Sequence, residues 1–326
     1  MITAAHSAQQ EIRTIQVLAA PDLSHYHVLV IVPAYNEERF IGSVILKLKQ
    51  HPVEVLVIDD GSKDLTCQIA RAAGVEVHCL EFNQGKGTAL NTGFQLARQR
   101  QPDVVVVIDA DGQHLPEELP SVIAPILNQQ ADICVGSRYI EDTSNTPTQR
   151  RLGHKLINLA TSVPSGIYVS DSQSGFRAFS PRALDLIQFK SDDFSVESEM
   201  QFLAREHALK VVEVPITIHY GEEAKRPAVQ QGRIVLNGIL RLVGQYRPLL
   251  SFGVPGMAAL LGSLALGIVV VQRYISTLEL AVGYAMITVL LAMTGLLMLS
   301  TGITLHSVRA LLSDMFNAFT KKIEHG

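Results

Sequence analysis

The chain has 326 residues, 47% of them hydrophobic, and its formal net charge is −4. This length accommodates one large domain with a smaller part beside it, and the slightly acidic balance argues against nucleic acid as a partner held by overall charge. Its three cysteines are sparse, odd in number and without the spacing of metal ligands, which argues against a disulfide framework and favours buried thiols. They are Cys67, Cys79 and Cys134.

Residues 1–20 lack the apolar segment that follows the basic start of a signal peptide, so a signal peptide is not expected there. We expect residues 1–25 to form a flexible extension instead. In residues 26–228, short β-branched runs alternate with segments of helical spacing. Strands are predicted at 28–32, 53–58, 75–80, 104–108 and from 133 onward, with helices at 37–50, 64–73, 87–99 and 117–128 between them. This alternation predicts an α/β fold with a mostly parallel sheet and helices on both faces.

The second half of this domain has a looser pattern. Residues 149–163 have the apolar spacing of an amphipathic helix, and 211–219 alternate as a half-exposed strand does. Residues 221–231 are polar and are expected to be mobile. Residues 229–247 follow as an amphipathic helix, which we expect to lie on the membrane surface.

Two long apolar runs occupy residues 248–308. Charged residues are absent from 248–272 and, with histidine counted as neutral, from 280–308, and each run exceeds the ~20 residues that cross a bilayer. They predict a transmembrane hairpin joined by residues 273–279; a pair of buried core helices is the alternative. Arginines and lysines flank the outer ends, so the positive-inside rule places both termini and the N-terminal domain in the cytoplasm, with 309–326 as a cytoplasmic tail.

Acidic residues follow two predicted strands, and carboxyl ends of parallel strands are where such sheets bind ligands. Asp109 and Asp111 end the fourth strand, and two carboxylates in one turn suit Mg²⁺ or Mn²⁺. Gln113 and His114 are candidates for a further ligand or hydrogen bond. A solvated acidic turn is the alternative interpretation, which the position at the end of a buried strand disfavours.

Other polar residues near these strand ends suit a nucleotide. Asp60 would accept a hydrogen bond from a base, while its neighbour Asp59 would orient the turn that follows. The fork of Arg138 would hold a phosphate, unless it forms a surface salt bridge. Lys86 stands between two glycines, where bare backbone permits close approach of a ligand.

Taken in order, these motifs resemble family 2 glycosyltransferases with the GT-A fold, and in particular the dolichyl- and polyprenyl-phosphate sugar synthases, of which dolichyl-phosphate mannose synthase is the best-known type. The resemblance covers about residues 28 to 220. It is carried by Val32-Pro33-Ala34-Tyr35-Asn36-Glu37-Glu38, Ile58-Asp59-Asp60-Gly61-Ser62-Lys63-Asp64, Asn83-Gln84-Gly85-Lys86-Gly87, Asp109-Ala110-Asp111-Gly112-Gln113-His114, Gly136-Ser137-Arg138-Tyr139 and Ser174-Gly175-Phe176-Arg177-Ala178-Phe179.

The resemblance implies roles for individual residues. The positions that match the family's nucleoside contacts are Pro33, Tyr35, Glu37, Ile58 and Asp60. Those that match its metal and diphosphate site are Asp109, Ala110, Asp111 and Gln113, with Arg138 at a phosphate-contacting position. The spacing Arg150, His154, Asn158 resembles the helix that faces the acceptor phosphate in the family, although His154 stands where the family has Ser. Basic residues that close over the donor in the family have their candidates in Lys225, Arg226 and Arg233.

The function so implied is inverting transfer of a hexose from a nucleotide-sugar, GDP-mannose or a UDP-hexose, to a polyprenyl or dolichyl phosphate at the bilayer. Asp171, Glu197 and Glu199 are candidates for acid/base or sugar contacts, or for capping turns. The alternatives are a polysaccharide or glycolipid synthase of the same superfamily with a hydroxyl acceptor, a non-catalytic membrane-tethered nucleotide-binding module, and a phosphotransferase. Two membrane helices could also pack against copies of themselves, so a homo-oligomer is a further possibility.

Overall fold

A computed structural model describes residues 21–140, 148–191, 196–219 and 228–324, without the side chains of 148–154, 228–236 and 313–324. The chain divides into two compact units, Met1–Ile239 and Leu240–Gly326. The N-terminal extension predicted for residues 1–25 lies largely outside the described residues.

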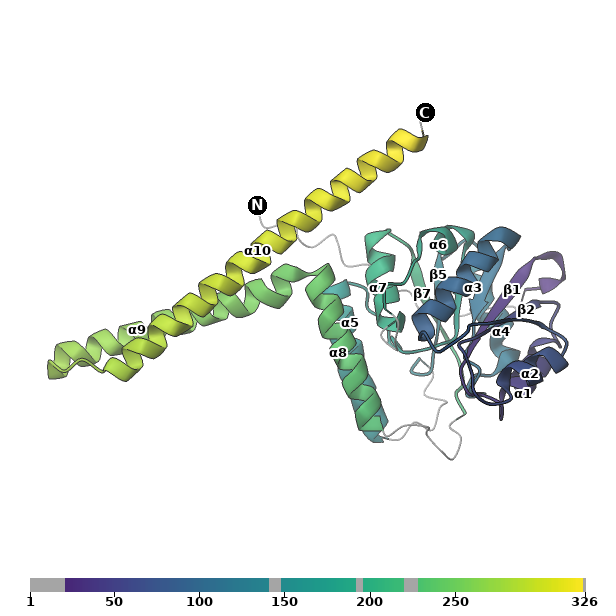
Figure 1. Ribbon diagram of the computed structural model, residues 1–326, viewed down its shortest axis with the longest axis horizontal. Helices are drawn as coiled ribbons and strands as arrows, with labels where there is room; N and C mark the ends of the chain where they lie inside the picture. The colour runs from purple at the N-terminus through teal and green to yellow at the C-terminus, as the bar shows by residue number, and fades with distance from the viewer. Residues whose placement is uncertain (1–20, 141–147, 192–195, 220–227, 325–326) are drawn as a thin grey trace. The chain divides into compact units, whose positions relative to one another are not determined.

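The first unit is built on a seven-stranded sheet with the order β3-β2-β1-β4-β6-β5-β7 (Figure 1). β6 is antiparallel to β4 and β5, and every other neighbouring pair is parallel. The strands are β1 (Val28–Ala34), β2 (Glu54–Asp59), β3 (Glu76–Cys79), β4 (Val104–Val107), β5 (Ile133–Ser137), β6 (Arg177–Phe179) and β7 (Val211–Pro215). The prediction of a mostly parallel α/β sheet is confirmed.

Helices cover both faces of this sheet (Figure 1). Successive side chains of a strand point to opposite faces, so Val30 and Val32 of β1 pack with the helices of one face while Ile31 meets α3 on the other. The helices of this unit and the one that leads out of it are η1 (Leu23–His25), α1 (Ile41–Leu48), α2 (Thr66–Ala72), α3 (Lys86–Arg100), η2 (Pro116–Glu118), α4 (Leu119–Leu127), α5 (Thr148–Ser165), α6 (Pro181–Leu186), α7 (Val196–Glu206) and α8 (Ala228–Tyr246).

Several details differ from the predicted elements, and neither α6 nor α7 was predicted. α1 begins at Ile41 rather than near Glu37, because the carbonyl of Glu37 accepts from the backbone N–H groups of Phe40 and Ile41 and closes a turn first. β6 was not predicted. Its three residues are too few to show a period, and its place between β4 and β5 depends on pairing with segments 42 to 74 residues earlier in the chain.

The second unit contains two long apolar helices. They are α9 (Val254–Thr277), which follows a π-helical turn η3 (Leu249–Gly253), and α10 (Val282–Glu324). The segments Leu249–Thr277 and Val282–Leu312 are long and apolar enough to cross a membrane, and only 17% and 6% of their most apolar windows are buried. Such exposure contradicts the alternative of buried core helices.

The turn of this hairpin is shorter than predicted. Arg273 lies inside α9, and the helix ends where Leu278 takes a positive φ of 55° and its N–H bonds to the carbonyl of Tyr274. The helices then pack closely through glycines, because a Cβ on Gly256 would lie 2.8 Å from the carbonyl oxygen of Gly295. These two helices are therefore in backbone contact.

Candidate functional site

The polar motifs gather at the carboxyl ends of the parallel strands, as predicted. β1 and β2 end side by side, with Ala34 paired to Asp59, and the N–H of Asp60 donates to the carbonyl of Ala34 at 2.8 Å. β4 lies on the other side of β1 and leads directly to Asp109. Segments up to 75 residues apart in the chain therefore meet at one edge of the sheet.

Asp109 takes part in an ion-paired group that connects three elements. The Nζ of Lys86, at the start of α3, lies 2.7 Å from Asp109 Oδ1 and 2.6 Å from Glu197 Oε1 on α7. Burial opposes the charge of Lys86, but the two carboxylates outweigh it and raise the pKa of the lysine above its usual value. Burial also opposes the charge of Asp109 and on its own would raise the pKa of this carboxyl. Lys86 and the other basic groups near Asp109 outweigh burial and lower that pKa.

Among the described residues, Asp111 experiences more burial and repulsion than compensation by positive charge. Burial, followed by the repulsion from Asp109 and a smaller one from Glu37, raises the pKa of Asp111 to about 6. Its Oδ1 accepts from the N–H of Gln113 at 3.0 Å, which fixes the turn. Two hard oxygen ligands beside each other with surplus negative charge fit a divalent cation such as Mg²⁺ or Mn²⁺.

Gly175 shapes the space around Asp109. A Cβ built on this glycine would lie 2.0 Å from Asp109 Oδ2, so only a bare backbone lets the two segments approach. Gly175 lies two residues before β6, the strand between β4 and β5. The geometry thus gives this glycine a packing role at the acidic site.

Asp60 anchors the glycine-rich loop. Its two oxygens accept from the backbone N–H groups of Gln84 and Gly85, both at 2.8 Å, while burial raises the pKa of its carboxyl. These bonds hold the start of α3, and with it Lys86, at the edge of the sheet. The sequence predicted that Asp60 contacts a base. The observed bonds show that Asp60 also holds the glycine-rich loop in place.

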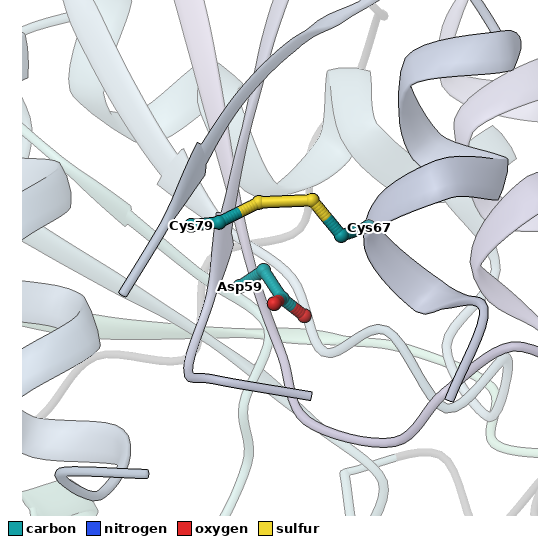
Figure 2. Close-up of side chains that lie close together, drawn as sticks. All are labelled: Asp59, Cys67 and Cys79. Carbon is teal, nitrogen blue, oxygen red and sulfur yellow. A yellow bond between two sulfur atoms is a disulfide. The ribbon is translucent and has the colours of Figure 1, made fainter. Parts of the chain in front are cut away.

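Asp59 orients the following turn, as predicted, by accepting from the N–H of Ser62 at 3.1 Å. The cysteine prediction was wrong, because Cys67 of α2 and Cys79 of β3 form a disulfide, which Figure 2 shows beside Asp59. The spacing of 12 residues gave no sign of it, since the pairing depends on how α2 packs on β3. Cys134 is a buried free thiol, as expected.

Arg138 forms a buried ion pair rather than a surface salt bridge. Its Nε donates to Asp171 Oδ2 at 2.5 Å, and its backbone N–H reaches the same oxygen at 3.3 Å. The arginine side chain is 8% exposed and the aspartate is fully buried. Asp171 therefore orients Arg138. The sequence had left Asp171 with several possible roles, namely acid/base chemistry, a sugar contact or the capping of a turn.

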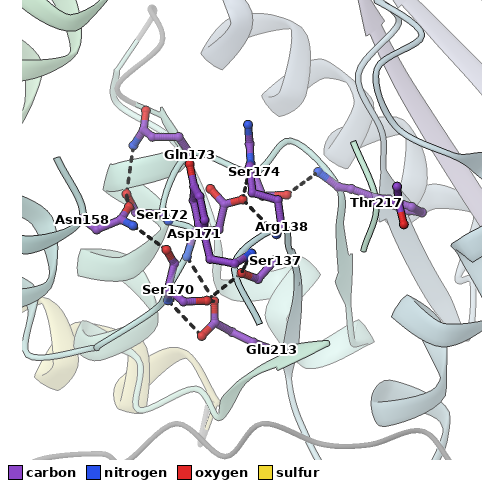
Figure 3. Close-up of polar contacts among 12 residues, drawn as sticks. Ser137, Arg138, Asn158, Ser170, Asp171, Ser172, Gln173, Ser174, Glu213 and Thr217 are labelled. Carbon is purple, nitrogen blue, oxygen red and sulfur yellow. Dashed lines mark hydrogen bonds and ion pairs between the residues drawn. The ribbon is translucent and has the colours of Figure 1, made fainter. Parts of the chain in front are cut away.

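Asn158 of α5 binds the loop that carries Asp171 (Figure 3). Its Oδ1 accepts from the N–H of Ser172 at 3.0 Å and from the hydroxyl of Ser172 at 2.6 Å, and its Nδ2 donates to the carbonyl of Ser170. Both ends of the amide are thus engaged with the protein. The side chains of Arg150 and His154, on the same helix, lie outside the described residues.

The remaining predicted residues are buried, partly exposed or not described. The side chain of Ile58 is fully buried against Gly93 of α3, and Ala110 belongs to the hydrophobic core, as does much of β1 around Pro33. Those that keep partial exposure near the acidic site are Tyr35, Glu37 and Gln113. Arg226 and Lys225 lie outside the described residues, and Arg233 is on α8 with its side chain not described.

Three further polar residues resolve into distinct roles. His114 is buried with its ring edge-on to Phe176, and burial lowers its pKa to about 4, so the ring is neutral. Glu199 accepts from the N–H groups of Lys190 and Ser191 and thereby fixes a turn. Glu197 instead binds Lys86, a contact that no sequence pattern indicated because it joins residues 111 positions apart.

Known proteins share both the sequence and the fold. The profile of glycosyl transferase family 2 matches residues 29–187. An uncharacterised protein of Methanocaldococcus jannaschii is 40% identical over 206 residues, covering 62% of this chain and 85% of that protein. The UDP-N-acetylglucosamine–dolichyl-phosphate N-acetylglucosaminyltransferase of Methanococcus voltae is 35% identical over 217 residues, covering 60% and 86%, respectively.

A further relative is the undecaprenyl-phosphate mannosyltransferase of Micrococcus luteus, 33% identical over 224 residues, which cover 64% of this chain and 91% of the relative. Among solved structures, glucosyl-3-phosphoglycerate synthase from Mycobacterium tuberculosis with Mg²⁺ and UDP matches with a TM-score of 0.58 at 22% identity, over 72% of this chain and 86% of that one. That likeness supports the fold. The chain belongs to glycosyltransferase family 2 and is a glycosyltransferase with the GT-A fold.

Proposed function

We propose that this glycosyltransferase moves a sugar, with inversion, from a nucleotide-diphosphate sugar such as GDP-mannose or a UDP-hexose to a polyprenyl or dolichyl phosphate at the cytoplasmic membrane face. The observation that carries the proposal is that one chain combines an acidic site at the sheet edge with two helices able to cross a membrane. An isoprenoid acceptor stays in the bilayer, so its enzyme must work at the surface. The two named relatives transfer sugars to dolichyl and undecaprenyl phosphates, as their names state.

The donor would bind where the strands β1, β2 and β4 end. Asp109 and Asp111 would hold Mg²⁺ or Mn²⁺, with Gln113 beside them, and the cation would supply charge neutralisation for the departing diphosphate. Solved relatives contain Mn²⁺ or Mg²⁺ together with UDP. The ammonium group of Lys86 lies between Asp109 and Glu197. It would add its positive charge to that of the cation beside the departing diphosphate.

The acceptor requires little catalytic machinery. A polyprenyl phosphate is an anion at neutral pH, so its oxygen would attack the anomeric carbon without prior removal of a proton by a strong base. The bond from that carbon to the diphosphate oxygen would break as the new bond forms, and the diphosphate would leave with the electron pair. Arg138, with Arg150 and His154 of α5, would bind the acceptor phosphate and offset the repulsion between two anions.

The experiment is a transfer assay with the full chain in detergent. It uses undecaprenyl phosphate, Mg²⁺ and a panel of labelled GDP-mannose, UDP-glucose and UDP-N-acetylglucosamine. We expect one labelled glycolipid that appears with one donor and disappears when EDTA is added. A parallel reaction contains a hydroxyl-bearing lipid in place of undecaprenyl phosphate. Product in that reaction alone would show that the acceptor is a hydroxyl and not a phosphate, and no glycolipid from any donor would contradict the proposal.

A further inference from the structure

A buried polar network surrounds the ion pair of Arg138 and Asp171 (Figure 3). Asp171 lies in the loop 170–174, which lacks regular secondary structure, yet this aspartate has no exposed surface. The geometry of Arg138 therefore depends on whatever holds this loop in place.

Glu213 of β7 holds this loop together with Asn158. Both of its carboxylate oxygens accept from the N–H of Ser170 at 2.9 Å, and Oε1 also accepts from the Ser170 hydroxyl at 2.9 Å and from the N–H of Asp171 at 3.2 Å. Oε1 takes all three donors and Oε2 shares the N–H of Ser170. In an amide, one of these oxygens would be replaced by an NH₂ group, a donor that faces the N–H of Ser170. Glu213 is 4% exposed, so the loop is fixed by a buried acid from a neighbouring strand.

The network closes on itself through β5. The hydroxyls of Ser170 and Ser137 lie 2.6 Å apart, and Ser137 is the last residue of β5, directly before Arg138. β5 and β7 are parallel neighbours in which Val135 pairs with Glu213. Glu213 of β7 therefore lies beside Val135, two residues before the end of β5, and Ser170 connects its carboxylate to Ser137.

We propose that Glu213 is a positioning residue for Arg138, acting through Ser170 and Asp171. The inference rests on the proposed function for the role of Arg138 at a phosphate, but the contacts that define it stand apart from that function. Burial raises the pKa of Glu213, the bonds from Ser170 and Asp171 counteract it, and those bonds require an acceptor at this position whatever the charge.

The test compares Glu213→Gln with Asp132→Asn. Asp132 precedes β5 at the opposite end of the same strand pair, where its Oδ2 accepts from the N–H of Lys210, which precedes β7, at 2.8 Å. Both changes turn a carboxylate that accepts from the backbone into an amide, but only Glu213 lies in the Arg138 network; Asp132 also binds the side chains of Ser180 and Arg182. We expect Glu213→Gln to lower kcat/KM about 10- to 100-fold and Asp132→Asn to leave it within about twofold.

A double-mutant cycle separates positioning from general damage. Glu213→Gln added to Arg138→Ala should cost little more than Arg138→Ala alone, and it should change the KM values of donor and acceptor in the same pattern as Arg138→Ala does. Losses that multiply in the double variant, or a Glu213→Gln enzyme as active as wild type, would overturn the assignment.

Two readouts do not depend on glycolipid formation. Hydrogen exchange at the amides of Ser170 and Asp171 should accelerate in Glu213→Gln and stay unchanged in Asp132→Asn. Binding of undecaprenyl phosphate, measured without a donor, should weaken in Glu213→Gln and in Arg138→Ala, and should weaken no further in the double variant. If the wild type makes no glycolipid, the proposed function fails; if exchange at these amides is unchanged by Glu213→Gln, the positioning role fails.

Discussion

Asp111 is the residue at which function and stability oppose each other. Its folded pKa of about 6 lies above the ordinary 3.8, so the charged form is disfavoured in the folded protein. A carboxyl with a raised folded pKa contributes most to stability at low pH, and that contribution is lost as the pH rises through about 6. At pH 8, without metal, the charged Asp111 therefore costs stability on the order of 1 to 3 kcal/mol.

We predict that Asp111→Asn abolishes transfer while leaving the metal-free protein at least as stable as wild type at pH 8. Thermal unfolding in EDTA should show the variant ahead at pH 8, with a lead that shrinks as the pH falls below about 6 and vanishes only below about 3.8. Added Mn²⁺ should raise the melting temperature of wild type only. A variant that keeps full activity, or that responds to Mn²⁺ as wild type does, would show that the metal is held elsewhere.

Gly175 gives a second test at this scale. Its replacement by alanine would place a methyl group 2.0 Å from Asp109 Oδ2, so the carboxylate must move away from Lys86 or the loop must shift. We predict a loss of kcat of at least about 100-fold in Gly175→Ala. Gly244→Ala is the control, because a Cβ there meets nothing within 4 Å. Equal activity of the two variants would remove Gly175 from the site.

At the level of elements, local patterns predicted most of the architecture. Apolar β-branched runs located the four strands β1 to β4, and apolar spacing located α5, because a strand or helix buried on a sheet must repeat apolar residues at its own period. β6 escaped prediction since three residues cannot show a period, and its place depends on partners far along the chain. Secondary structure was therefore more predictable than the order of the strands.

The site was predicted as residue types but not as contacts. Acidic motifs at strand ends identified Asp109 and Asp111, because parallel strands end at a common edge. The ion pair of Lys86 with Glu197 and the disulfide of Cys67 with Cys79 join separate elements, so only the packed structure reveals them. Long-range pairings of this kind leave no periodic or motif signal in the sequence.

The α9–α10 hairpin makes its own prediction at this scale. Small residues allow membrane helices to approach closely, and a Cβ on Gly295 would lie 2.8 Å from the carbonyl oxygen of Gly256. We predict that Gly295→Leu separates the helices and lowers the melting temperature of the detergent-solubilised protein. Gly283→Leu, on the same helix, should leave it unchanged because a Cβ there meets nothing within 4 Å. If both variants melt alike, packing at Gly295 does not stabilise the hairpin.

For the whole molecule, the orientation of the hairpin decides whether the catalytic unit can reach its donor. Nucleotide-sugars are made in the cytoplasm, so the proposed function requires the first unit on that side. Arg241 and Arg247 precede the first uncharged run (248–272) and Arg309 follows the second (280–308). The segment between the runs has one Arg and one Glu, Arg273 and Glu279. The excess of positive charge at the outer ends of the hairpin favours this orientation.

We predict that a cysteine in place of Glu279 reacts with a membrane-impermeant maleimide on intact cells. The other cysteines give little background, because Cys134 is buried and Cys67 is bonded to Cys79. A cysteine in place of His325, near the C-terminus, is the matched control and should react only after lysis, since the two ends of a two-span hairpin lie on the same side. If the cysteine at position 325 reacts on intact cells and the cysteine at position 279 reacts only after lysis, the catalytic unit lies outside the cell. It would then meet no cytoplasmic nucleotide-sugar, which would contradict the proposed function.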